Sequence, residues 1–365
     1  MSSPPARGGS LWALVAAVFI VETGVFAVVP VLPLYLRDRG VGFGTVGLIV
    51  GVQFAVAFAL QYPMGRLADR FGRRRFLIAG AVIFAIANGG FVAPLGIPTM
   101  VLLRALQGLG VALFIPAASA LVADLSAPER RGRAYGWLQA ARIGGLTAGP
   151  AIGGVVALAG RVRVFELTAA IELLAAVVLL VTVPARVAHH PDEIPDVGET
   201  AATVAALRHR QRTNFIGVAA VMAGFTFLFG SYSTIWPLFM RGIGASDATV
   251  GLSFTLFGLP LLVVTPVAGW AADRFDRRRL ALLGYAGGGI CAPLYPLVRS
   301  IPLVLLIGVM EASMLAFTEP AIGALVMEDV APHRRAGVQG GVFAIQSFAE
   351  AAGALSGGAL FALGP

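Results

Sequence analysis

The chain of 365 residues is 58% hydrophobic and only 13% charged, and its mean hydropathy is +0.84. Soluble domains carry roughly a quarter of charged residues, so this composition excludes an ordinary soluble globular protein and indicates membrane helices. The formal charge of +8 comes entirely from arginine, and the single cysteine, Cys291, excludes a disulfide framework and a cysteine-based metal site.

Eleven apolar stretches are each long enough to cross a bilayer as a helix, which takes about 20 residues, so we expect an all-α membrane protein. In chain order they are residues 11–36, 46–64, 76–95, 100–125, 134–159, 164–183, 215–240, 250–270, 280–298, 303–326 and 338–363. A polar tail (1–10) precedes them. The one long polar connection, 185–213, predicts a flexible cytoplasmic linker between a six-span bundle (11–184) and a five-span bundle (214–365).

The arginines predict how these spans are oriented. The N-terminal tail and every second connection hold most of the 27 arginines, whereas the opposite connections hold few. Because cytoplasmic loops are enriched in arginine and lysine, the N-terminus and residues 65–75 are expected in the cytoplasm. We expect a multi-pass protein of the cell membrane, either plasma or inner membrane.

The two bundles are copies of each other. The ungapped shift that carries Asp69 to Asp273 also aligns Gly65 with Gly269, Arg73 with Arg277, Pro33 with Pro237 and Pro116 with Pro320. Since an even number of spans separates the copies, they are parallel repeats about an axis along the membrane normal, with a substrate site expected between them near the midplane. The sequence ends before an equivalent of the sixth span, as in a truncated or atypical chain.

Four motifs lie in order along the chain. Residues 30–36 read PVLPLYL, 65–75 read GRLADRFGRRR, 102–110 read LLRALQGLG and 145–154 read GLTAGPAIGG. Together they resemble the major facilitator superfamily, and within it the twelve-span drug/proton antiporters. The resemblance implies the major facilitator fold, here with about eleven spans in two parallel repeats. It also implies proton-coupled antiport by alternating access, with export rather than import.

The resemblance assigns residues 65–75, which we call the hinge, and its second copy to a cytoplasmic conformational latch. The matched positions are Gly65, Asp69, Arg70, Gly72 and Arg73, with Gly269, Asp273, Arg274 and Arg277 in the second copy. The resemblance places Asp69 against the start of the eleventh span near Val338, and carboxylates are favourable at such helix N-termini. Asp276 replaces the second glycine, so the second copy is expected to be the weaker one.

The fifth-span motif has a physical interpretation of its own. Gly145, Gly149 and Gly153, the glycine stripe, recur every four residues and form a smooth face that lets two membrane helices approach closely. Gly154 extends this small surface, and Pro150 removes a backbone donor and kinks the helix locally. Close packing alone accounts for the stripe, whereas Pro150 beside it favours a gating role.

Ionisable groups inside spans are the candidates for mechanism, because they are costly there and usually face a cavity or the bundle interior. At 1.5 Å per residue, Glu22 and Arg142 lie about 16 Å and about 12 Å from the cytoplasmic ends of their spans. Arg104 enters from the other side, so Arg142 is the expected neighbour of Glu22. Competition of a proton, an arginine and a cationic substrate for Glu22 would couple export to proton entry. A permanent ion pair is the structural alternative.

The other candidate residues lie in the fourth and sixth spans and in the second repeat. The resemblance assigns Arg104 to proton transfer, although this side chain could equally hold backbone carbonyls in place. A second-half cavity is expected at Glu311, Glu319 and Glu350, with Tyr232 and Trp236 placed to stack on a planar or cationic substrate. Glu172 lies in a span that is peripheral in this family, so we expect a structural role for its side chain.

The expected partners are membrane lipid, a small-molecule substrate and protons, without nucleic acid, in a monomer. Neither a P-loop, a nucleophile–base pair nor a metal cluster is apparent, so the sequence indicates no enzyme and no cofactor other than the proton gradient. Two other functions fit the same sequence. One is a facilitator for a sugar or another metabolite, and the other is a non-transporting membrane sensor on the same fold.

Overall fold

A computed structural model describes residues 7–93, 96–184, 201–318, 321–322, 325 and 335–363, and all regular secondary structure in these ranges is helical. The expectation of an all-α protein is confirmed there. The first repeat contains α1 (Arg7–Val28), α2 (Leu32–Asp38), α3 (Phe43–Phe71), α4 (Arg73–Gly90), α5 (Ile97–Leu125), α6 (Arg131–Ala157) and α7 (Arg161–Thr182). The second contains α8 (Ala201–Gly242), α9 (Asp247–Arg274), α10 (Arg277–Cys291), the 3-10 helix η2 (Ala292–Leu297), α11 (Ile301–Leu315) and α13 (Arg335–Leu363).

The helices follow the predicted spans with two differences. Residues 201–213, expected as part of the linker, form the first turns of α8, since the sequence AATVAALRHRQR is rich in good helix formers. The predicted stretch 303–326 is helical as α11 only as far as Leu315. Within the described residues, six helical segments are long and apolar enough to cross a membrane, namely Gly9–Asp38, Phe43–Phe71, Ile97–Leu125, Arg161–Thr182, Asp247–Thr265 and Arg277–Leu297.

The chain forms two compact units. Unit 1 comprises Met1–His190, Phe227–Thr255 and Glu350–Pro365, so it joins the first repeat to one end each of α8, α9 and α13. Unit 2 comprises Pro191–Thr226 and Leu256–Ala349.

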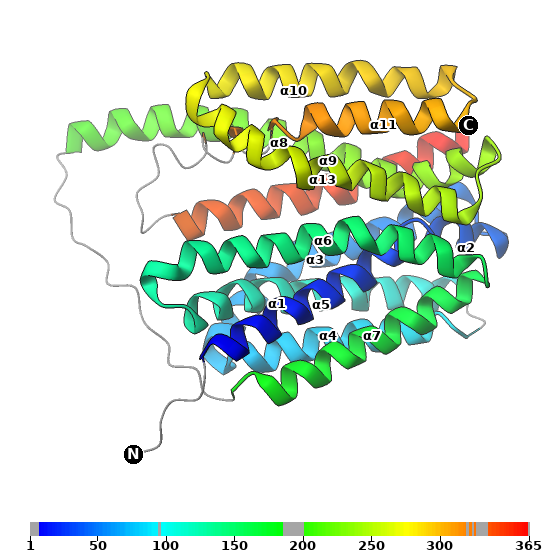
Figure 1. Cartoon of the computed structure of the whole chain (residues 1–365), viewed down its shortest axis with the longest axis horizontal. Coiled ribbons are helices and arrows are strands. Elements are labelled where there is room, and N and C mark those ends of the chain that lie inside the picture. Colours follow the sequence, from blue (N-terminus) through cyan, green and yellow to red (C-terminus); the bar gives the residue numbers. More distant parts are fainter. Residues whose placement is uncertain are drawn as a thin grey trace. The chain divides into compact units, whose positions relative to one another are not determined.

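In unit 1 the helices of the first repeat pack as neighbouring pairs, α1 with α6 and α7, α5 with α3 and α4, and α4 with α7 (Figure 1). Two apolar clusters fill this bundle. One collects Leu14, Phe84, Phe114, Leu138 and Leu179 from five different helices. The other is centred on three buried aromatic rings, of which Tyr35 and Phe165 have ring centroids 4.8 Å apart. Such burial of large side chains holds the five helices at fixed positions.

In unit 2, α10 packs against α11. The contact depends on a missing side chain, because a Cβ atom at Gly284 would lie 2.8 Å from the backbone oxygen of Met314. Tyr285 of α10 donates a hydrogen bond of 2.8 Å to the backbone oxygen of Val221, which joins α10 to α8.

Candidate functional site

The glycine stripe packs directly against α1. A Cβ atom would lie 2.6 Å from Glu22 Cβ if added at Gly145, 2.6 Å from the backbone oxygen of Thr23 at Gly149, and 2.1 Å from the backbone oxygen of Ala27 at Gly153. No side chain fits at these distances. The close helix approach expected from the stripe is therefore confirmed, and α1 is its partner.

The stripe also brings a buried carboxylate and a half-buried arginine together. Arg142 lies three residues before Gly145, on the same face of α6. Its Nε atom is 3.0 Å from Oε1 of Glu22, whose side chain is only 10% exposed. The pairing expected from helix depth is confirmed, whereas its role in coupling stays a prediction.

A second carboxylate shares this arginine. Glu350 of α13 interacts electrostatically with Arg142, and its helix packs closely on α8, where a Cβ atom at Gly230 would lie 2.1 Å from the backbone oxygen of Glu350. Because α13 belongs to the second repeat, Arg142 interacts with a carboxylate of each repeat. Two carboxylates with one guanidinium can hold a proton or a cation in place of that arginine.

Arg104 lies in a different cluster. It is 6% exposed and donates to the backbone oxygens of Ile49 at 3.2 Å and Val50 at 3.3 Å, and to the amide oxygen of Gln107. It therefore holds carbonyls of α3, as one of the two interpretations of the sequence expected. The proton-transfer role implied by the resemblance stays a prediction.

Sequence reasoning missed the partners of this cluster. Gln107 donates to Asn88 of α4 at 2.7 Å, and Asn88 donates to both carboxylate oxygens of Glu172 at 2.9 and 2.8 Å. A small cavity lies beside Asn88, Arg104 and Gln107. An asparagine in an otherwise apolar span was the sequence signal for this network.

The proposed second-half cavity residues fall in different places. Tyr232 and Trp236 lie in unit 1 with ring centroids 5.9 Å apart, and the indole of Trp236 donates to Ser253 at 2.8 Å. Glu311 lies in unit 2, where it is 2% exposed and accepts a hydrogen bond of 2.6 Å from Tyr295. Glu319 lies outside the described residues. The structure thus groups Tyr232, Trp236 and Glu350 in unit 1, and Glu311 in unit 2.

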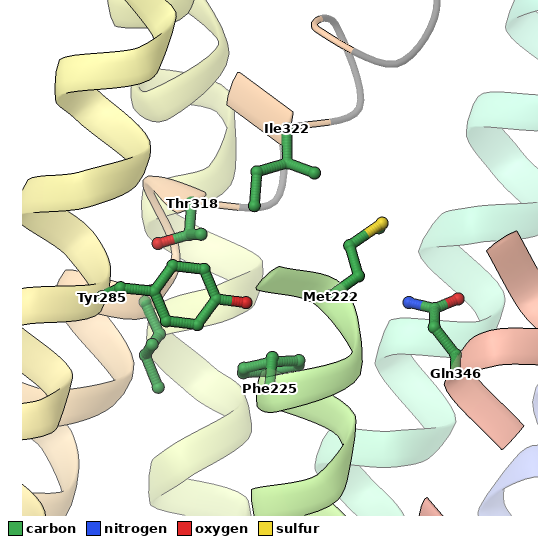
Figure 2. A pocket seen from close by; sticks show the side chains of 7 residues that line it. Met222, Phe225, Tyr285, Thr318, Ile322 and Gln346 are labelled. Carbon is green, nitrogen blue, oxygen red and sulfur yellow. The ribbon is translucent and has the colours of Figure 1, made fainter. Parts of the chain in front are cut away.

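Unit 2 contains a pocket that the site prediction did not include. Figure 2 shows its side chains, which α8, α10, the segment after α11 and α13 contribute. The pocket is small and is lined by Met222, Phe225, Tyr285, Leu315, Thr318, Ile322 and Gln346. Its lining is mostly apolar with one amide, which suits an apolar group rather than an ion.

The hinge is held together by its arginine Arg73. This side chain binds Asp69 at 2.8 Å and Asp124 of α5 at 2.7 Å. Burial lowers the pKa of Arg73, but its hydrogen bonds to the two carboxylates outweigh burial and raise the pKa above its ordinary value. Asp69 remains 56% exposed on its other side, and its action on the eleventh span stays a prediction.

The two copies of the hinge turn by different means. Gly72 has a φ of 106°, a conformation that residues with a Cβ atom rarely adopt. In the second copy Asp276 has a φ of −61°, and its carboxylate caps α10 by accepting a hydrogen bond of 2.8 Å from the backbone nitrogen of Arg279. The aspartate therefore replaces glycine because this turn needs a cap and no positive φ.

An ion cluster closes the end of the bundle opposite the hinge. Arg161 at the start of α7 binds Asp38 at the end of α2 and, at 2.8 Å, Asp247 at the start of α9. Two close glycine contacts involve α6 with α9 and α3 with α13. A Cβ atom at Gly154 of α6 would lie 2.9 Å from Cα of Gly251 of α9, and one at Gly47 of α3 would lie 2.9 Å from Cα of Gly358 of α13. These contacts join the first repeat to the second, so Gly154 serves α9 and not α1.

Next to Pro150, a hydroxyl group enters the hydrogen bonding of α6. Thr255 of α9 donates to the backbone oxygen of Thr147 at 2.6 Å and accepts from the backbone nitrogen of Ala151 at 3.1 Å. These two backbone groups are four residues apart and would bond each other in a regular helix. The irregularity expected from Pro150 is thus stabilised from the second repeat.

We expect Thr255→Val to weaken the contact between α6 and α9. The loss of the bridging hydroxyl should lower stability by about 1 kcal/mol, because valine removes the two hydrogen bonds that join α9 to α6. The melting temperature of the purified protein measures this loss. Thr255→Ser keeps the hydroxyl and is the matched control. Equal melting temperatures of the two variants would show that the bridge contributes nothing.

Two curated relatives match part of the chain. Quinolone resistance protein NorA of Staphylococcus aureus is 28% identical over 167 residues, which cover 46% of this chain and 43% of NorA. Multidrug resistance protein 2 of Bacillus subtilis is 32% identical over 165 residues, which cover 45% of this chain and 41% of that protein. The matched region spans less than half the length of either relative.

Solved structures share the fold over nearly the whole chain. A bacterial homologue of the human lysosomal transporter Spinster, in an inward-facing and unoccupied conformation, has a TM-score of 0.81 at 18% identity and covers 97% of this chain and 82% of its own. A D-xylose–proton symporter has a TM-score of 0.67 at 19% identity, with coverages of 95% and 88%. At these identities the likeness concerns the fold alone.

The profile of one protein family matches both halves of the sequence. The matches run over residues 14–241 and 218–365. They agree with the four motifs, the internal repeat and the helical fold. Because the matches extend through both repeats, the chain belongs to the Major Facilitator Superfamily of multi-pass membrane transporters and resembles its drug/proton antiporters.

Proposed function

We propose that the protein is a proton-coupled antiporter of the cell membrane that exports small apolar or cationic compounds by alternating access. The observation that carries this proposal is the ion pair of Arg142 with Glu22 of the first repeat, together with the electrostatic interaction of Arg142 with Glu350 of the second. The names of two relatives, a quinolone resistance protein and a multidrug resistance protein, support the choice of substrate class.

The coupling follows from competition for Glu22. A bare charge inside a membrane bundle is costly, so Glu22 needs a proton, a cationic substrate or Arg142 as its partner. When a proton or substrate takes Glu22, Arg142 loses that partner and its attraction to Glu350 grows in relative weight. Since Glu350 belongs to the second repeat, occupancy of Glu22 changes the attraction between the repeats, which is what alternating access requires.

The direction and setting of transport complete the proposal. The arginine distribution supports a cytoplasmic N-terminus, and a cytoplasmic hinge with it. Protons then enter from the outside as substrate leaves. The working unit is a monomer in lipid that uses the proton gradient, without another cofactor and without nucleic acid. Tyr232 and Trp236 would stack on a planar or cationic substrate.

Transport in proteoliposomes with an imposed pH gradient tests the proposal. An ethidium-like dye should move against its own gradient only while the pH gradient persists, and an ionophore that collapses the gradient should stop it. Dye movement that does not depend on the pH gradient would favour a facilitator. If no compound in a panel of dyes, sugars and metabolites moves, the protein would be a sensor on this fold and the proposal would be wrong.

A further inference from the structure

A second buried carboxylate lies in the first repeat, connected to an arginine by two amides. We call Arg104, Gln107, Asn88 and Glu172 the buried relay. Arg104 of α5 donates to the amide oxygen of Gln107, Gln107 donates to Asn88 at 2.7 Å, and Asn88 donates to both oxygens of Glu172. Glu172 is fully buried, and the other three side chains are at most 6% exposed.

The order of donors and acceptors indicates the charge of each end. An arginine side chain only donates hydrogen bonds, so Gln107 must face Arg104 with its oxygen and Asn88 with its nitrogen. Asn88 must then accept with its oxygen, which leaves its nitrogen for Glu172. A carboxylate that only accepts is the ionised form. All three links therefore point from the cation toward the anion.

No charged side chain contacts Glu172 directly in the part of the chain that the structure describes. The neighbour of Glu172 on α1 is Gly24, where a Cβ atom would lie 2.9 Å from Oε1 of Glu172. Glu22 is two residues away, roughly 200° around that helix, and is paired with Arg142 of α6. On α7 itself, Glu166 is paired with Arg163 near the helix start.

The arginines of α4 and α5 do not bind Glu172 directly, and the hydrogen bonds to Glu172 come from Asn88. The α4 helix contributes that amide, and its arginines lie at the hinge end, where Arg73 binds Asp69 and Asp124. The α5 helix contributes Arg104 through the relay. Compensation for the charge of Glu172 thus comes from a single arginine over two amides.

Water has a place beside the middle of the relay. A small cavity there is lined by Asn88, Arg104, Gln107 and Gln53 among its polar groups. It has room for about one water molecule, and the four polar side chains provide hydrogen bonds for it. A hydronium ion in this cavity is one residue away from the carboxylate.

We propose that Glu172 is a second proton-binding site of the first repeat, separate from Glu22, and that Asn88 and Gln107 transmit its charge to Arg104. The carboxylate takes a proton from hydronium, an O–H bond forms on Glu172 and a water molecule remains. Removal of the negative charge weakens the hydrogen bonds that Asn88 donates to Glu172, and with them the polarisation of the amide chain back to Arg104. Arg104 stays bound to Gln107 and to the carbonyls of α3.

This inference adds a proton site to the proposed function and rests on it for its biological use. The site itself is tested on the purified protein in lipid nanodiscs, without substrate, by infrared difference spectra between neutral and acidic pH. A buried carboxylate that takes up a proton produces a carboxylic C=O stretching band. We expect one component of this band in the unmodified protein to be absent in Glu172→Gln.

Two further variants make the assignment specific. Asn88→Leu removes the amide that bonds the carboxyl group, so the same component should persist at a shifted frequency. Glu166→Gln removes an exposed carboxylate of the same helix and should leave the component unchanged. If Glu172→Gln does not fold, the frequency in Asn88→Leu alone decides.

The proton site is refuted if the band is the same in Glu172→Gln as in the unmodified protein. It is also refuted if the frequency of the component does not shift in Asn88→Leu. This outcome is distinguishable from a failure of the proposed function. Proteoliposomes that move no compound would refute antiport and would leave the infrared band of Glu172 in place.

Discussion

Replacing Glu22 by glutamine is expected to reduce proton-driven export to the background of empty proteoliposomes. Glutamine has the size of glutamate but neither binds a proton nor forms an ion pair with Arg142, whose Nε atom lies 3.0 Å from Glu22 in the structure. The amide also cannot neutralise a cationic substrate. The loss should therefore concern the coupled step itself and not only its rate, and dye flux under an imposed pH gradient measures it.

Two controls separate coupling from folding in this experiment. Glu166→Gln removes a carboxylate that is paired with Arg163 at the surface of α7, and it should transport as the unmodified protein does. The melting temperature of Glu22→Gln should stay close to that of the unmodified protein, because glutamine can still accept a hydrogen bond from Arg142. Uphill, gradient-dependent export by Glu22→Gln would remove Glu22 from the coupling mechanism.

Replacing Gly145 by alanine is expected to lower both stability and transport. The added methyl group would lie 2.6 Å from Cβ of Glu22 and 2.8 Å from the backbone nitrogen of Thr23, so α1 has to move away from α6. Overpacking of this kind costs about 1–3 kcal/mol. The shift also draws Glu22 away from Arg142. We expect a lower melting temperature together with reduced proton-driven flux.

Gly136→Ala provides the matched control on the same helix. Gly136 is exposed, and a Cβ atom there has nothing within 4 Å. Alanine is a better helix former than glycine by about 1 kcal/mol, so this variant should be as stable as the unmodified protein or slightly more so. Equal behaviour of Gly145→Ala and Gly136→Ala would show that the close approach of α1 and α6 is not needed.

The periodic and repeated features of this protein could be predicted from sequence. Long apolar runs predicted the helices because a membrane leaves few other structures possible. The four-residue spacing of Gly145, Gly149 and Gly153 predicted a close helix pair, and counting residues along the spans predicted that Arg142 meets Glu22. Each of these depends on position along one helix, which the sequence states directly.

Contacts that depend on rotation around the helix axis could not be predicted in this way. The resemblance predicts a structural role for Glu172 because its span is peripheral in the family, and the sequence does not show that Asn88, 84 residues away, donates to it. The same holds for Arg161, whose partners Asp38 and Asp247 come from different repeats. The identity of such neighbours depends on how whole helices pack, and the fold supplies that information.

The hydroxyl of Thr255 has a consequence for the energy of moving the repeats apart. Its oxygen bridges the backbone oxygen of Thr147 and the backbone nitrogen of Ala151 of α6. When α9 leaves, these two backbone groups are free at the same time and at the spacing of an ordinary helical bond. Separation of α9 from α6 then replaces the two hydrogen bonds of Thr255 by one backbone hydrogen bond within α6. Neither backbone group is left without a hydrogen bond in the membrane. The two arrangements can thus lie close in free energy, which lets a small driving force reverse their order.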